Sequence, residues 1–541
     1  MQILKYIAVI LAGLAAPASG YPPASGGDGA AEASPARDLT QSEAASVMEF
    51  VYQGKTRLAI DYLESMADSC GVEPLYIVVK SRVYRELLTV DDENKDRVKE
   101  DAEPILRDLE AVIELCSRRM DDGDDDPSLR LYRGLAWMSR SHLHSFARKF
   151  WRAGREAKNG KSDLEKYLEI RPDDALAQGT MGVFLYFADT IPSVFKYLSK
   201  LMFMPSGDRE KGLRYIEYAS ENPSFLKTEF EVVRYNIDLL FEGEYESGID
   251  GTIGLVNRYP GNPRVAMPLA LMLPFDPFGM PENARIVDNT IEGLQSLPPT
   301  APERGPLTLI EFLNAYADRF IAPPDVAATE LRAIADENPE HPDWVGGYAA
   351  FELGRLLASL GEADEARTAF DWVDHNDRVD YLHDDASRLS KALQKIDKSM
   401  NVPRSRWMTE IYFGEPGDRK NAIEDITSTA STPLSDFYLG EALLLNGDFD
   451  AALTAYGELL EADIDPWSVE FKMLAASRIA EIHGSRGDFE SASHWLDRAA
   501  EYYQKEFLVD WVLEGRKRHY ERLMENDEPA SASPGLLTQR P

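Results

Sequence analysis

Residues 439–459, LGEALLLNGDFDAALTAYGEL, carry small residues, a glycine and an aromatic residue at spacings that occur twice more in the chain. The small residues Gly440 and Ala452 predict two helices that approach closely, and Tyr456 predicts a ring between successive helix pairs. Gly447 predicts the end of the first helix, because glycine tolerates the left-handed conformation needed there. The other two copies are LGRLLASLGEADEARTAFDWV at 353–373 and IAEIHGSRGDFESASHWLDRA at 479–499.

Helix pairs of this kind cannot bury their apolar faces alone, so they must stack on neighbouring pairs. The three copies resemble the tetratricopeptide-repeat (TPR) family. This resemblance implies an all-α fold, a tetratricopeptide-like α-solenoid in which helix pairs stack into a superhelix. We expect clear repeats in residues 342–525 and degenerate repeats in residues 40–341, because both regions have helical period and lack an alternating strand pattern.

Residues 178–219 depart from the repeat pattern, because an apolar stretch containing Pro192 is inserted between the two helices of one pair. This stretch resembles a hairpin found in some exported bacterial TPR proteins of unassigned role. We expect an irregular apolar insert near residues 190–206, which either forms an adaptable contact surface or folds back to cap the solenoid interior. The candidate contact residues are Phe195, Leu198, Met202, Phe203 and Met204.

The amino terminus has the features of a secretory signal peptide within residues 1–20. A lysine and an apolar run at 6–15 precede small residues that allow removal of 1–18 or 1–20. An N-terminal membrane anchor is the alternative, but spanning a bilayer takes about 20 apolar residues and this run breaks at Pro17. No cysteine lies at the cleavage point, which excludes a lipobox. We therefore predict an exported protein, periplasmic or secreted, without a transmembrane span after signal removal.

Both ends of the predicted body are flanked by segments with few apolar residues. Residues 21–37 and 526–541 contain too little apolar surface to offset the entropy of ordering them. We expect a flexible linker in the first segment and a disordered tail in the second. The folded body is then roughly 40 to 525.

Charge and cysteine content limit the possible partners. The 541 residues include 58 Lys and Arg against 93 Asp and Glu, a net charge of -35 that repels nucleic acid. A partner with a basic surface would be steered toward the chain. The two cysteines, Cys70 and Cys116, lie near the ends of helices that neighbour each other in a solenoid, so they form either a disulfide or two buried free thiols.

The remaining polar residues form no known motif for catalysis or metal binding. The closest histidines, His142 and His144, are two residues apart and so lie on nearly opposite faces of a helix. The run DDGDDD at 121–126 lacks the spacing and terminal glutamate of a calcium loop, so we expect a solvated loop. Hydrolase, nucleotide and dinucleotide motifs do not occur. The sequence therefore predicts no metal, no cofactor and no enzymatic activity.

Stacked pairs predict a concave surface lined by the first helix of each pair. Aromatic anchors surrounded by charge suit a peptide or protein groove. Packing against neighbouring helices is the alternative fate of these side chains. The candidate groove residues are Tyr348, Phe351, Arg355, Phe437, Glu441, Ser477 and Glu481.

These observations predict a monomeric exported scaffold or adaptor that binds envelope proteins or peptides in its concave groove. The alternative function is a small-ligand or lipid carrier, in which the apolar insert 181–206 and the loop 267–281 enclose a cavity. For the loop, MPLALMLPFDPFGMP, core packing is the competing expectation.

Overall fold

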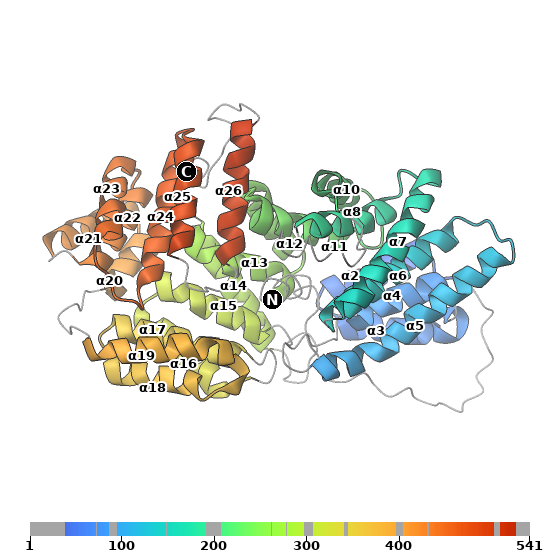
Figure 1. Ribbon diagram of the computed structural model, residues 1–541, viewed down its shortest axis with the longest axis horizontal. Helices are drawn as coiled ribbons and strands as arrows, with labels where there is room; N and C mark the ends of the chain where they lie inside the picture. Colours follow the sequence, from blue (N-terminus) through green and yellow to red (C-terminus); the bar gives the residue numbers. More distant parts are fainter. Residues whose placement is uncertain are drawn as a thin grey trace. The chain divides into compact units, whose positions relative to one another are not determined.

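The protein is described by a computed structural model, in which all regular elements of the described residues are helices (Figure 1). The sequence prediction of an all-α fold is confirmed. The described residues are 38–71, 73–85, 95–147, 149–190, 207–260, 262–276, 279–296, 307–339, 344–395, 404–429, 432–502 and 509–525.

The chain divides into two compact units, which are described separately. The N-terminal unit consists of Met1–Tyr235, Leu255–Val265 and Gly293–Pro306, and the C-terminal unit of Asn236–Gly254, Ala266–Glu292 and Leu307–Pro541.

In the N-terminal unit, consecutive helices pack side by side, most extensively α6 on α7 and α8 on α10. Their apolar faces form one core that runs from the first helix to α11. The helices up to this point are α2 (Gln41–Tyr52), α3 (Thr56–Cys70), α4 (Pro74–Arg85), α5 (Lys95–Asp121), α6 (Ser128–Phe146), α7 (Phe150–Ile170), α8 (Ala175–Thr190), α10 (Arg209–Glu221) and α11 (Lys227–Ile237).

The chain then passes through a middle segment whose residues are divided between the two units. Its elements are η1 (Asp238–Glu242), α12 (Tyr245–Arg258), α13 (Pro263–Met272), η2 (Leu273–Phe275) and α14 (Met280–Gln295).

The rest of the C-terminal unit again pairs consecutive helices, as in α17 with α18, α22 with α23 and α24 with α25 (Figure 1). Its elements are α15 (Leu307–Ile321), α16 (Pro324–Glu337), α17 (Val345–Ser359), α18 (Ala363–Asp374), η4 (Asp377–Leu382), α19 (His383–Ala392), η5 (Leu393–Lys395), α20 (Arg404–Met408), η7 (Thr409–Phe413), α21 (Pro416–Ser428), α22 (Pro433–Leu445), α23 (Phe449–Glu461), α24 (Val469–Ser485), α25 (Phe489–Glu501) and α26 (Val509–Glu525).

The turn between α22 and α23 shows why the repeat sequence folds in this way. Gly447 has a φ of 81°, the left-handed conformation that ends a helix. The side chain of the next residue, Asp448, accepts a hydrogen bond from the backbone N–H of Ala451 and so caps α23. Gly487 and Asp488 repeat this arrangement between α24 and α25, with a φ of 76° at the glycine.

Close approach within each pair depends on the small residues that the sequence singled out. A Cβ atom at Gly440 would lie 2.4 Å from Cε1 of Tyr456, and one at Gly354 would lie 2.6 Å from Cε1 of Phe370. Only glycine leaves room for these rings, because real Cβ atoms do not approach carbon so closely. The predicted stacked helix pairs are therefore confirmed in both repeats.

In this structure both cysteines are buried free thiols, one of the two expected states. Cys70 is the last residue of α3, and Cys116 lies near the end of α5. Helix α4 packs against both α3 and α5, so the two thiols belong to helices that share this neighbour. Burial raises the pKa of the Cys116 thiol to about 11.

Several predictions fall on residues outside the described ranges. These are the signal peptide, the linker 21–37, the tail 526–541 and the five contact residues proposed for the insert. Within the described ranges, no helix combines the length and the apolar character needed to cross a bilayer.

The acidic run 121–126 begins at Asp121, the last residue of α5, and its other residues lie in the short connection to α6, as expected for an inter-helix loop. Arg119 donates a hydrogen bond from Nε to Asp124 Oδ2 at 2.8 Å, and the backbone N–H of Ser128 donates to Asp126 Oδ1 at 2.9 Å. The loop carboxylates thus bind a neighbouring arginine and a backbone donor at the start of α6. In the described residues, no cluster of three or more His, Cys, Asp or Glu side chains is arranged to hold a metal ion.

Candidate functional site

The seven candidate groove residues all lie on the first helices of pairs in the C-terminal unit, namely α17, α22 and α24. Aromatic contacts join two of these helices, because the ring centroids of Phe437 and Phe471 are 5.0 Å apart. All seven side chains are buried, however. The expectation of a solvent-open groove at these residues is wrong, and the alternative of packing against neighbouring helices describes them.

The reason is that other segments of the same unit cover this inner face. Helix α15 reaches it through Arg319, η2 through Phe275 and α26 through Arg516. Each of these residues contacts a polar side chain of α24. The inner face is therefore a site filled by the chain itself, and its geometry follows from two buried polar networks.

The first network joins α15, α17 and α24 through two arginines and two glutamates. Arg319 pairs with Glu352 and Glu470, and Arg355 pairs with Glu470. Arg355 Nη1 also lies 3.4 Å from Glu352 Oε1. All four side chains are buried, so the two positive and two negative charges compensate each other where water does not screen them.

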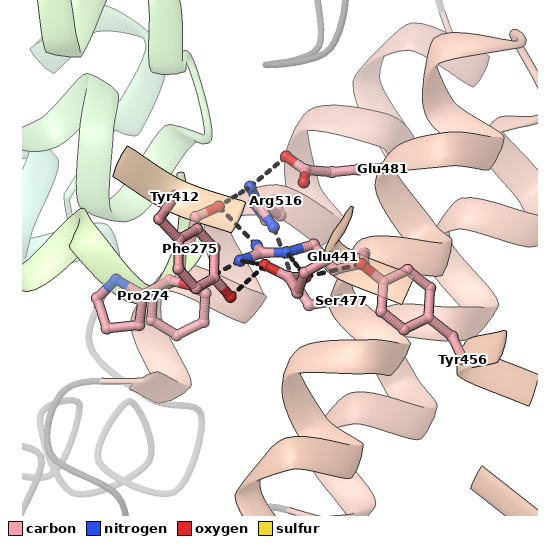
Figure 2. Close-up of polar contacts among 9 residues, drawn as sticks. Pro274, Phe275, Tyr412, Glu441, Tyr456, Ser477, Glu481 and Arg516 are labelled. Carbon is pink, nitrogen blue, oxygen red and sulfur yellow. Dashed lines mark hydrogen bonds and ion pairs between the residues drawn. The ribbon is translucent and has the colours of Figure 1, made fainter. Parts of the chain in front are cut away.

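The second network is centred on Glu441 of α22, whose side chain is completely buried (Figure 2). Tyr412 and Tyr456 donate their hydroxyl groups to its two oxygens at 2.9 and 2.7 Å. Arg478 of α24 donates from Nε to Oε1 at 3.0 Å. Burial, and then the Glu441 carboxylate, raise the pKa of both tyrosines well above its usual value, so the hydroxyls remain donors.

The two terminal nitrogens of Arg478 bind main-chain oxygens of η2. Its Nη1 donates to the carbonyl of Phe275 at 2.9 Å and its Nη2 to the carbonyl of Pro274 at 2.8 Å. Arg516 of α26 approaches the Phe275 carbonyl at 3.5 Å and donates to Ser477 Oγ at 2.7 Å. The guanidinium groups thus hold a proline-containing segment by its backbone, as Figure 2 shows around Pro274 and Phe275.

Arg516 is itself held by two neighbours. It pairs with Glu481, the last of the predicted groove residues, and it lies over the ring of Tyr245 at 4.6 Å from the centroid. Burial raises the pKa of Glu481, although Arg516 and Arg478 oppose this shift. Desolvation therefore outweighs the two arginine partners at this carboxyl group.

The glycines that end the helices and the close packing of consecutive helices together identify the fold. The chain has a tetratricopeptide-like fold. No protein-family model and no curated protein sequence matches it. Among solved structures, the P58(IPK) TPR domain aligns at 13% identity over 74% of this chain and 99% of its own, with a TM-score of 0.18. Yeast Tom70 aligns at 12% identity over 91% and 98%, with a TM-score of 0.21. The assignment rests on the geometry of the tetratricopeptide-like pairs, since TM-scores this low carry no weight.

The described part of the loop 267–281 is core of the tetratricopeptide-like unit rather than the wall of a cavity. Leu269, Met272 and Leu273 are fully buried, and Phe275 is only 1% exposed. Asp276 follows and accepts a hydrogen bond from the backbone N–H of Gly279 at 2.8 Å, which turns the chain toward α14. Core packing, the competing expectation for this loop, is thus what the described residues show.

Sequence reasoning missed most of the charged partners on the inner face. Glu441, Arg355 and Glu481 were predicted there, but the residues that neutralise them were not. The signal available was a charged residue within an otherwise apolar helix face, which is rarely tolerated unless paired. The missed residues are Arg319, Glu352, Glu470, Arg478 and Arg516.

A separate group of acids lies on α14, α15 and α16 of the same tetratricopeptide-like unit, with Asp318 and Glu330 half-buried and Asp288 exposed. Asn314 Nδ2 donates to Asp288 Oδ1 at 3.4 Å and to Asp318 Oδ2 at 3.2 Å. Burial, and then repulsion from Glu330, raise the pKa of Asp318 well above its usual value. Burial raises the pKa of Glu330 as well. These acids can retain a proton at a pH where an exposed carboxyl is ionised.

Proposed function

We propose that this protein is an exported helical-repeat scaffold that binds other proteins and acts as a monomer. The observation that carries the proposal is how its inner face is used. In the C-terminal unit, Arg478 of the repeat helix α24 and Arg516 of α26 donate hydrogen bonds to the carbonyl groups of the Pro274–Phe275 segment. Repeat helices that bind a peptide backbone in this way suit protein recognition better than chemistry on a small substrate.

Because the chain's own segment fills this inner face, partners would contact the exposed faces of the helices. The first helices of the pairs are used for internal packing, as the burial of Phe351 and Phe437 shows. The binding of envelope proteins or peptides is therefore proposed for outward-facing surfaces. Export is proposed from the signal-peptide features of residues 1–20.

The carrier alternative gains no support from the described residues. It needs the loop 267–281 to line a cavity, and residues 267–276 contribute buried side chains to the core instead. We therefore propose only the scaffold function.

Site-specific photocrosslinking in the native cells tests the scaffold. A photoreactive amino acid would replace an exposed residue on each of three helices: Ser162 of α7, Val326 of α16 or Lys420 of α21. We expect discrete protein adducts at some positions and not at others, because a scaffold has defined binding faces. Adducts at none of the positions, or adducts only to lipid, would contradict the proposal, and samples without irradiation are the control.

Export is tested separately by the mass and N-terminal sequence of the mature chain. We expect cleavage after Ala18 or Gly20 and recovery from the envelope or the medium. An intact N-terminus on a cytoplasmic protein would contradict export and would leave the scaffold proposal to the crosslinking result.

A further inference from the structure

Helix α7 has an exposed face whose charge is opposite to that of the chain. The stretch 149–166, KFWRAGREAKNGKSDLEK, contains six Lys or Arg residues against three Asp or Glu residues, in a chain with a net charge of -35. No acidic residue lies in the first turn of α7, where acids are usually favoured by the helix dipole. The beginning of this helix is therefore a local source of positive potential.

The acids of this stretch do little to neutralise its exposed cations. Glu156 and Asp163 are buried. Glu156 lies 3.0 Å from Arg140, and Asp163 lies 2.7 Å from Arg133, so both are paired with arginines of α6. The remaining acid, Glu165, lies 3.4 Å from its own neighbour on the helix, Lys161.

Four exposed cations of α7 remain without an ion pair to any residue in the part of the chain that the structure describes. Elsewhere in the N-terminal unit some arginines are paired, such as exposed Arg57 with Asp61 at 3.0 Å and half-buried Arg234 with Glu221 at 3.2 Å, whereas exposed Arg107 of α5 forms no ion pair with the described residues. Helix α7 brings four such cations together on one helix. They are Arg152, Arg155, Lys158 and Lys166.

An exposed tryptophan lies among these cations. Trp151 is 57% exposed, the highest value among the large hydrophobic side chains that the structure describes. Trp151, Arg155 and Lys158 are spaced i, i+4 and i+7, so they form one stripe along α7 with a length of about 10 Å. We call these three residues the α7 stripe.

We propose that the α7 stripe is the docking surface for an acidic segment of a partner protein. This inference rests on the scaffold function proposed above and names its binding face. Tryptophan and arginine are the residue types that most often dominate binding energy at protein interfaces. Because the rest of the chain is strongly acidic, an acidic segment would be repelled elsewhere and guided to this stripe.

A protein segment fits the stripe better than an anionic membrane does. A helix that lies in a membrane interface needs a free apolar face to insert among the lipids. On α7 the apolar residues Ala157, Leu164 and Tyr167 are buried against the unit's core. The exposed apolar side chains Trp151 and Ile170 lie at opposite ends of α7, so Trp151 alone stands beside the stripe's cations. This favours a partner that offers carboxylates and one apolar contact.

The test uses a phage library of short random peptides, selected against the full chain. We expect the selected peptides to be enriched in Asp and Glu and to carry an apolar residue. Binding of labelled synthetic copies is then measured by fluorescence anisotropy. We expect affinity to fall about tenfold or more for Arg155→Glu with Lys158→Glu, and for Trp151→Ala.

A matched control reverses two other exposed cations that form no ion pair with the described residues, Arg107→Glu on α5 with Lys420→Glu on α21. This control changes the net charge by the same amount but leaves the α7 stripe intact, so affinity should stay within about twofold. Circular dichroism and urea unfolding of each variant separate a lost contact from a lost fold.

Three outcomes of this experiment separate the α7 inference from the scaffold proposal. If peptides are selected but bind the stripe variants as well as the wild type, or lack acidic residues, the α7 inference fails and the scaffold proposal stands. If the wild type selects no peptide, the α7 inference fails, and the crosslinking result decides the scaffold proposal. If no acidic peptide is selected but phosphatidylglycerol vesicles bind the wild type and not the stripe variants, the surface recognises lipid and the protein-docking inference is overturned.

Discussion

Replacing Glu441 by leucine tests whether the buried polar network stabilises the C-terminal unit. Leucine has nearly the volume of glutamate but offers no acceptor. The change leaves Arg478 without its carboxylate partner and removes the acceptor for the hydroxyls of Tyr412 and Tyr456. Arg478 keeps its two contacts to the carbonyls of η2, so the guanidinium stays where it is but loses its counter-charge.

The size of the effect follows from the burial of the pair. Glu441 and Arg478 are at most 1% exposed, so the remaining cation cannot be hydrated without a rearrangement. Removing one partner of a buried ion pair destabilises by about 3–5 kcal/mol. A domain is typically stable by only about 5–15 kcal/mol, so the loss lowers the folded-to-unfolded ratio by a factor of roughly 10² to 10⁴.

Urea unfolding followed by tryptophan fluorescence measures this loss. Trp407 and Trp467 are buried in the C-terminal unit and change environment when it unfolds. With a urea dependence of about 2 kcal/mol/M, we expect the midpoint of this transition to fall by roughly 1.5–2.5 M. Asp450→Ala is the control, because Asp450 is 88% exposed and its ion pair with Arg486 is a surface contact.

A second variant identifies the cause of the destabilisation. In Glu441→Leu with Arg478→Met, the unpaired cation is gone, so part of the lost stability should return although the η2 carbonyls lose their donor. Two results would refute the reasoning. One is a loss in the free energy of unfolding below about 1 kcal/mol for Glu441→Leu, and the other is a loss in the double variant larger than the sum of the losses in the two single variants.

Further predictions concern packing, protonation and thiols. Gly440→Ala should destabilise by about 1–3 kcal/mol in urea unfolding because its Cβ would meet a ring, whereas Gly457→Ala, with nothing within 4 Å, should be neutral or stabilising by about 0.5–1 kcal/mol. Because the pKa of Asp318 is raised by folding, the C-terminal unit should lose stability as the pH rises from about 4 through that raised pKa. Asp318→Asn should remove this loss. The free energy of unfolding is measured at several pH values, and an equal pH dependence in the wild type and in Asp318→Asn would contradict the reasoning. Cys70 and Cys116 should resist alkylation in the native chain and react after denaturation, and an intact mass two hydrogens lower would reveal a disulfide instead.

Local chemistry explains why the helix pairs could be predicted. The stretch 439–459 predicts two helices and a left-handed turn, and each feature depends on residues close together in sequence. Gly447 ends α22, and Asp448 caps α23 one residue later. Tyr456 packs against Gly440 only sixteen positions away. Such short-range rules act in the same way wherever the stretch is placed.

Exposure of the same helices could not be predicted in this way. The sequence places Glu441, Ser477 and Glu481 on the inner face, but it does not show what covers that face. The cover comes from η2 and α26, and the hydrogen bond from Arg478 to Phe275 joins residues 203 positions apart. A segment this distant leaves no periodic signal at the position that it covers.

The sequence by itself determined the class of the protein: an acidic, all-α chain of tetratricopeptide-like pairs, in which glycines and capping residues set the turns. Only the tertiary structure decided that the inner face is filled by the chain and that its charges neutralise one another. It also showed that uncompensated cations remain on α7, since pairing depends on which helices meet. Periodicity identifies the face of a helix that is apolar, whereas the burial of a charge depends on partners brought together by folding.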